Sequence, residues 1–104
     1  MNNVKIDIRK LTLCWGMKSC LKKMFKSHII ALNLTNLKRY AKWQARKRYY
    51  SIFWYDMAKL CRQLDNRTGF GFAVNKYSKL KQRNRNNRIP NDKLIKRFIK
   101  IFSK

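Results

Sequence analysis

Cationic and aromatic side chains alternate between residues 38 and 50, and no acidic residue interrupts them. They fall in three groups, at residues 38–40, 42–43 and 46–50. Lys and Arg contact phosphates and release counterions, while Tyr and Trp stack on unpaired bases or cover ribose faces. A solvated charged face is the simpler interpretation, but the lack of any acid to balance the cations argues against it. This stretch therefore predicts RNA binding, a chemistry in which no covalent bond changes.

Residues suited to catalysis are few and scattered. The chain has no Glu, a single His and four acidic residues, all of them Asp. General acid–base or metal catalysis needs paired carboxylates or clusters centred on His, and the sequence has neither. His28 lies on an apolar stripe, which favours a packed or RNA-facing histidine over a catalytic one. We therefore expect no enzymatic activity and no small-molecule substrate.

The three cysteines, Cys14, Cys20 and Cys61, give little support to a metal centre or a disulfide framework, because they form no C-x-x-C pair and are odd in number. The segment from Gly69 to Gly71 is not a phosphate loop, since no strand precedes it and no G-K-[S/T] follows it. We expect buried or half-buried thiols in a reducing compartment, no metal and no cofactor.

The charge of the chain points to a polyanionic partner. With 27 Lys and Arg against 4 acidic residues, the formal net charge is +23. Like charges at this density repel one another in a compact monomer, so nucleic acid or an anionic membrane surface becomes part of the argument for folding. Apolar residues at 45% and aromatic residues at 13% argue against complete disorder. We expect a chain that folds in part alone and is completed by its partner.

The longest run without a charged residue, 27–37, is too short for a membrane span.

Helical periodicity dominates the chain. Apolar residues recur at spacings of three and four over residues 17–32 and again over 53–64, with lysines mainly on the other side of the first stripe. No Gly or Pro occurs between residues 17 and 68. The simplest prediction is a long basic helix, straight or kinked.

The clearest predicted break lies at Gly69 and Gly71, where a turn is expected. The polar run 82–88 predicts a loop that faces solvent or RNA, and Asn91 can cap a last helix. The predicted fold class is all-α. Residues 1–50 are expected to form a basic N-terminal helical extension, and residues 51–104 a small helical globular domain.

The side chains predicted to bind RNA are cations, together with one serine and two aromatic residues close to them. They are Lys18, Ser19, Lys22, Lys23, Lys26, Arg39, Tyr40, Lys42, Trp43, Arg46, Lys47, Arg48, Arg83 and Arg85.

The order of certain residues matches a known pattern: an aromatic residue, a Gly and a basic residue before Ser, then a basic helix with a Tyr and an Arg-Lys-Arg, then a Trp. The matching residues are Trp15, Gly16, Lys18, Ser19, Tyr40, Arg46, Lys47, Arg48 and Trp54. Later positions that fit are Gly71, Tyr77, Leu80, Lys81, Asn91 and Lys93. On these residues the chain resembles the bacterial-type large-subunit ribosomal protein L-twenty family.

This resemblance implies an rRNA-embedded extension among 23S-type rRNA helices, neighbouring large-subunit ribosomal proteins as further partners, and a role in early subunit assembly. Ser51, Met57 and Lys59 stand where the family commonly has Arg, Arg and Asn, so some RNA contacts are expected to be lost or replaced. Residues with AT-rich codons are abundant. We therefore expect an organelle ribosome, a plastid in preference to a mitochondrion, or the bacterial cytoplasm of an AT-rich genome.

Two other classes of function remain open at this point. The first is another basic RNA- or DNA-binding protein, including a different ribosomal protein. The second is an amphipathic protein of the membrane surface, suggested by the stripe over residues 17–32.

Overall fold

The computed structural model describes residues 4–11, 15–83 and 89–102, and most of these are helical. The helical class is therefore confirmed. In chain order the elements are strand β1 (Val4–Asp7), the short 3-10 helix η1 (Ile8–Lys10), helix α1 (Trp15–Phe25), strand β2 (Ile29–Leu32), and helices α2 (Leu34–Arg46), α3 (Tyr50–Gln63), α4 (Arg67–Arg83) and α5 (Asp92–Phe102).

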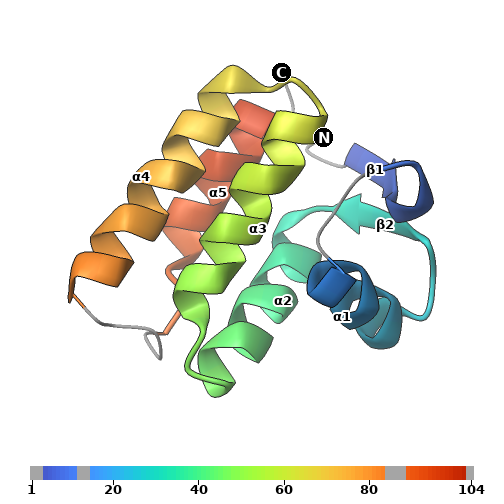
Figure 1. The fold of residues 1–104 in the computed structure, drawn as a ribbon, viewed down its shortest axis with the longest axis horizontal. Coiled ribbons are helices and arrows are strands. Elements are labelled where there is room, and N and C mark those ends of the chain that lie inside the picture. The colour runs from blue at the N-terminus through green and yellow to red at the C-terminus, as the bar shows by residue number, and fades with distance from the viewer. Residues whose placement is uncertain (1–3, 12–14, 84–88, 103–104) are drawn as a thin grey trace.

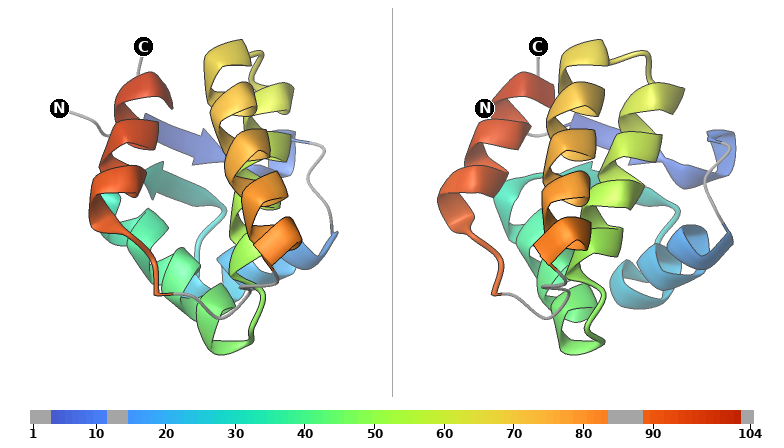
Figure 2. Two further views of the ribbon diagram at one scale, coloured as in Figure 1. Left: turned by 90° about the vertical axis from the view of Figure 1, so that its left-hand side faces the viewer. Right: turned by 60° about the vertical axis from the view of Figure 1, so that its left-hand side comes forward.

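Helices α3, α4 and α5 run side by side, and α2 packs against α3 and α5 (Figure 1). Helix α1 and the two strands lie on the side of the molecule away from α4, and the further views in Figure 2 show the same arrangement. The outer edges of the molecule are thus α4 on one side and α1 with the strands on the other.

Trp54 lies at the centre of the helical core. Its ring centroid is 5.6 Å from that of Phe98 on α5 and 5.9 Å from that of Phe72 on α4, and its side chain is fully buried. The apolar stripe of α3 that begins at Phe53 and Trp54 therefore faces the other helices, as its spacing predicts. Leu64, at the end of that stripe, is 39% exposed.

Strands β1 and β2 form an antiparallel pair in which Val4 is opposite Leu32 and Asp7 is opposite Ile29. Ile6, Ile30 and Leu32 are buried, so one face of the pair joins the core. The sequence did not predict these strands, because four residues are too few to distinguish the alternating pattern of a strand from the apolar spacing of a helix.

The long basic helix is not confirmed, because three turns divide residues 17–68. Helices α1, α2 and α3 are each followed by a residue with a left-handed backbone. These residues are Lys26 with φ 52°, Arg48 with φ 65° and Asp65 with φ 58°. Glycine is the usual residue at such a position, since a side chain there is strained. The sequence therefore carried no glycine signal for any of the three helix ends.

The ends of α2 and α3 use the same hydrogen bonds. The N–H of Arg48 donates to the carbonyl of Ala45 at 3.0 Å, and the N–H of Tyr49 donates to that of Gln44 at 2.8 Å. At the end of α3, Asp65 donates to Arg62 at 3.2 Å and Asn66 donates to Cys61 at 2.8 Å. These bonds satisfy carbonyls that a helix end otherwise leaves without a donor, which favours termination despite the strain.

The turn predicted at Gly69 and Gly71 is wrong in position, because both glycines lie in the first turns of α4. The turn is at residues 64–66, and Asn66 caps α4 by accepting a hydrogen bond from the N–H of Gly69 at 2.9 Å. Gly69 serves close packing, since a Cβ there would lie 2.7 Å from Sγ of Cys61.

The last helix is confirmed. The side-chain oxygen of Asn91 accepts hydrogen bonds from the N–H groups of Lys93 at 3.0 Å and Leu94 at 3.4 Å. Most of the predicted polar loop, residues 84–88, lies outside the described residues. The division of the chain at residue 50 stays a prediction, and in this structure residues on both sides of that position share one core.

Candidate nucleic-acid interface

Helix α2 separates its buried and cationic residues onto opposite sides. Leu37, Tyr40, Ala41 and Gln44 are buried, which is the spacing of one helix face. Arg39, Lys42 and Arg46 recur at spacings of three and four and are all exposed, so they form a single solvent-facing row, which we call the α2 cationic face.

The start of α2 is held by two asparagines. The side chain of Asn33 accepts a hydrogen bond from the N–H of Asn36 at 2.9 Å and so caps the helix. Asn36 in turn donates from Nδ2 to the carbonyl of Ala31 in β2 at 2.8 Å. These bonds tie the orientation of α2, and with it the direction of its cationic face, to the two-stranded sheet.

The described acidic side chains are engaged elsewhere or lie on other elements. Asp7 pairs with Arg9 at 2.8 Å, and this hydrogen-bonded partner lowers the pKa of the Asp7 carboxyl to about 2. Asp92 pairs with Lys38 at 3.0 Å, on the side of α2 that meets α5. Asp56 is buried and Asp65 is in the turn between α3 and α4. No ion pair within the described residues neutralises the α2 cationic face.

Two aromatic rings lie under cations at this surface. The guanidinium of Arg39 is 4.9 Å from the ring centroid of Phe25, at the end of α1, and the ammonium of Lys47 is 4.5 Å from that of Trp43. Such contacts orient a cation without cancelling its charge. The Arg39 contact also brings the basic end of α1 next to the α2 cationic face (Figure 1).

A shallow hollow of about 550 Å³ lies along α1 and the turn after it, and we call it the α1 hollow. Its lining residues are Ser19, Lys22, Lys23, Lys26, Ser27 and His28. The lining has hydroxyl, imidazole and ammonium groups and no carboxylate, which is the chemistry of an anion-binding surface. Ser19 and the three lysines were predicted, and His28 was expected to be either packed or RNA-facing, whereas Ser27, which directly follows Lys26, was not predicted.

Tyr40 does not lie at this surface, which corrects the prediction that it packs against ribose or bases. Its side chain is 1% exposed. The hydroxyl donates a hydrogen bond to Asp56 and accepts one from Gln44. The prediction was wrong here because the alternation of cations and aromatics does not distinguish a tyrosine on the inner face of an amphipathic helix from one at the edge of that face.

The other predicted residues fall into three groups. Arg46 at the end of α2, and Lys47 and Arg48 directly after it, are exposed, and their contact with RNA stays a prediction. Lys18 and Trp43 are half-buried. The side chain of Arg83 and all of Arg85 lie outside the described residues.

The thiols are placed as expected where the structure describes them. Cys61 is fully buried, and this burial raises the pKa of its thiol to about 12, while Cys20 is half-buried. Cys14 lies outside the described residues. Among the residues that the structure describes, no three His, Cys, Asp or Glu side chains come together as a metal site.

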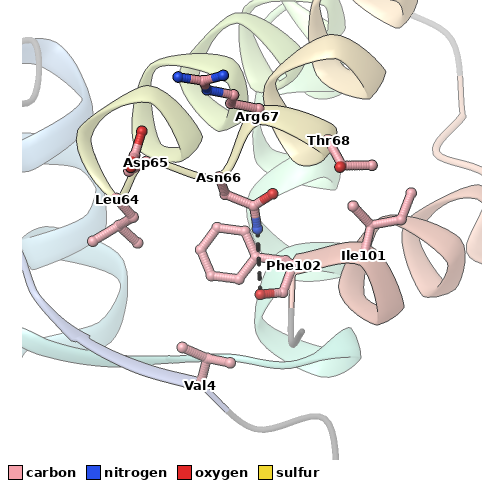
Figure 3. Close-up of a pocket in the computed structure, with 8 residues that line it drawn as sticks. All are labelled: Val4, Leu64, Asp65, Asn66, Arg67, Thr68, Ile101 and Phe102. Atoms are coloured by element: carbon pink, nitrogen blue, oxygen red, sulfur yellow. Dashed lines mark hydrogen bonds between the residues drawn. The ribbon is translucent and has the colours of Figure 1, made fainter.

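A second hollow, of about 530 Å³, lies between the turn after α3, the end of α5 and β1 (Figure 3). Its central polar group is Asn66, which donates from Nδ2 to the carbonyl of Phe102 at 3.4 Å and also caps α4. Because this amide already joins α4 to α5, its place in the hollow is explained by packing.

No helix in the described residues is long and apolar enough to cross a membrane. Comparisons with protein-family models, curated proteins and solved structures found no match.

Proposed function

We propose that this protein is a structural constituent of the large ribosomal subunit, where it binds 23S-type rRNA and supports early subunit assembly, without enzymatic activity. The observation that carries the proposal is the α2 cationic face beside the basic end of α1, with no acidic partner in the described residues. The cations of this surface neutralise phosphates, which releases counterions and lets RNA segments approach one another.

The sequence resemblance supports the ribosomal part of the proposal. It matches Gly16 and Lys18 on α1 and Arg46 at the end of α2, and these two helices carry the basic surface. In the assembled subunit, we propose that residues 1–50 act as the rRNA-embedded extension expected of that family, with other large-subunit proteins as neighbours. An organelle ribosome remains the proposed location.

A longer helix on rRNA also belongs to this proposal. The segment between α1 and α2 contains a single four-residue strand, β2, which pairs with β1, a strand that precedes α1. Phosphates that neutralise the lysines of residues 17–48 remove the repulsion that opposes a continuous or kinked basic helix. We expect the helical circular-dichroism signal of the protein to increase when RNA is added.

Salt-dependent binding tests the RNA interface. The variant Arg39→Gln, Lys42→Gln, Arg46→Gln should flatten the dependence of log binding constant on log salt by about 2–3, at roughly 0.7–0.9 per phosphate contact. The ligand is a fragment of 23S-type rRNA.

The matched control is Lys93→Gln, Lys96→Gln, Lys100→Gln, which removes the same number of exposed charges from α5. It should keep most of the slope. Equal losses in the two variants would mean that only total charge matters, and the α2 cationic face would then not be the interface.

Co-sedimentation distinguishes the ribosomal proposal from other basic proteins. The protein should remain with large subunits in high salt, because many buried phosphate contacts must be lost together for it to dissociate. Dissociation at moderate salt favours a general nucleic-acid-binding protein. Tight binding to anionic liposomes that RNA does not displace favours the membrane surface.

A further inference from the structure

A groove of about 560 Å³ runs between α3 and α4, and none of its lining residues comes from α1 or α2. We call it the α3–α4 groove. Tyr55, Lys59 and Arg62 contribute from α3, and Phe70, Val74 and Tyr77 contribute from α4. Each set follows the spacing i, i+4, i+7, so each lies along one side of its helix.

The groove presents aromatic rings that the core does not cover. Tyr55 is 45% exposed and Phe70 is 38% exposed. The rings of Tyr55 and Tyr77 lie 5.6 Å apart with an angle of 52° between their planes. The buried stripe of α3 lies on its other side, around Trp54, so Tyr55 faces away from the core, while Tyr77 packs against its edge.

Cations accompany the rings. Lys59 and Arg62 line the groove from α3, with Gln63 and Ser78 as further hydrogen-bonding groups, and no carboxylate lines it. Exposed aromatic rings beside cations, on a chain with a net charge of +23, suit a planar ligand that carries negative charge. A single-stranded nucleic acid combines the two, because each unpaired base is linked to a phosphate.

We propose that the α3–α4 groove binds a single-stranded segment of RNA, with an unpaired base stacked on Tyr55 or Phe70 and its phosphates against Lys59 and Arg62. The inference rests on the proposed RNA-binding function and adds a second surface to it. The α2 cationic face binds phosphates, whereas the groove recognises bases that are out of a duplex. Stacking is tolerant of sequence, because every base has a π-face.

The test uses the full chain and two probes: a single-stranded oligoribonucleotide of about eight nucleotides and a duplex of the same length. The variant Tyr55→Ala, Phe70→Ala should bind the single strand about 5- to 150-fold more weakly for each base that loses its stacking partner. Its affinity for the duplex should be unchanged. The single variant Tyr55→Trp keeps an aromatic platform and should retain single-strand affinity.

Ile89→Ala is the control, since Ile89 is 82% exposed, is not among the groove's lining residues and lies outside the predicted RNA-binding residues. It should bind both probes as the parent does. A circular-dichroism melt of each variant shows whether it is folded, and Tyr55→Trp tests the site should the double variant be unfolded.

The outcomes separate the two proposals. Unchanged single-strand affinity in the double variant, or lost affinity in Tyr55→Trp, overturns the groove proposal and leaves the α2 interface standing. If the Arg39, Lys42, Arg46 variant instead binds both probes as the parent does, the proposed RNA-binding function is wrong. Binding of an acidic peptide that competes with the single strand only in the parent would assign the groove to a protein segment, and it would also overturn the inference.

Discussion

The hydroxyl of Tyr40 donates a 2.6 Å hydrogen bond to Oδ2 of Asp56, and both side chains are buried between α2 and α3. Gln44, one turn after Tyr40, donates from Nε2 to the same hydroxyl at 3.0 Å. A buried carboxylate needs such donors, because burial without them is strongly unfavourable. The polar contact therefore fixes how α2 sits on α3, and indirectly which way the α2 cationic face points.

Replacement of Tyr40 by Phe should lower the free energy of unfolding by about 1.5–3 kcal/mol, the usual contribution of a hydrogen bond to a charged group. The ring and its packing remain, so the loss reports on the hydroxyl. Chemical denaturation measures it. Tyr49→Phe, at an exposed position, is the control and should change the stability little; equal stability of the two variants would contradict the role of the buried bond.

The same tyrosine predicts a loss of stability in alkali. Burial raises the pKa of Tyr40 above its ordinary value of 10.0, and the nearby Asp56 charge and hydrogen bond raise it further. Below pH 10 both the folded and unfolded forms keep the proton, and the stabilisation is complete. Above it the unfolded chain releases the proton while the folded chain does not, so stability falls by up to about 1.4 kcal/mol per pH unit.

Urea titrations at pH 9, 10 and 11 test this expectation. The loss of stability above pH 10 should be smaller in Tyr40→Phe than in the parent, whereas Tyr49→Phe should follow the parent. Deprotonation of lysines affects all three proteins alike, so the comparison isolates Tyr40. Parallel curves for parent and Tyr40→Phe would show that its hydroxyl titrates as an exposed one.

Gly69 and Gly71 should respond in opposite directions to alanine. At Gly69 the new Cβ would meet Sγ of the fully buried Cys61 at 2.7 Å and Oδ1 of Asn66 at 3.1 Å, so Gly69→Ala should destabilise by about 1–3 kcal/mol. At Gly71 nothing lies within 4 Å, and Gly71→Ala should stabilise by roughly 0.5–1 kcal/mol through helix propensity. Thermal melts compare the two variants. If Gly69→Ala is more stable than the parent, Gly69 and Cys61 are not in the close contact described between α4 and α3.

Asp65 follows α3 with φ 58°, a conformation that suits glycine better than Asp. Asp65→Gly should therefore stabilise the protein by about 0.5–1 kcal/mol, because relief of the strain exceeds the added entropy of the unfolded chain. Gln63→Gly, two residues earlier and inside α3, should destabilise by about 1 kcal/mol. If both glycines destabilise equally, α3 continues through Asp65 in solution.

Much of the helical core could be predicted from local pattern. The burial of Trp54 and Phe98 follows from apolar residues at helical spacing, and the start of α5 follows from Asn91 as its cap. These features depend on residues close in sequence. The exposed row formed by Arg39, Lys42 and Arg46 follows from the same periodicity.

The helix ends, the small sheet and the place of Tyr40 were decided by tertiary structure. Lys26, Arg48 and Asp65 adopt left-handed backbones that their side chains do not favour, so packing and the capping hydrogen bonds must select them. Strand β2 exists because β1, more than twenty residues earlier, pairs with it. Tyr40 is inside because Asp56, sixteen residues later, accepts its hydrogen bond. The periodicity of the sequence determined which residues share a helix face, but only contacts between distant segments decided where each helix stops and which face is covered.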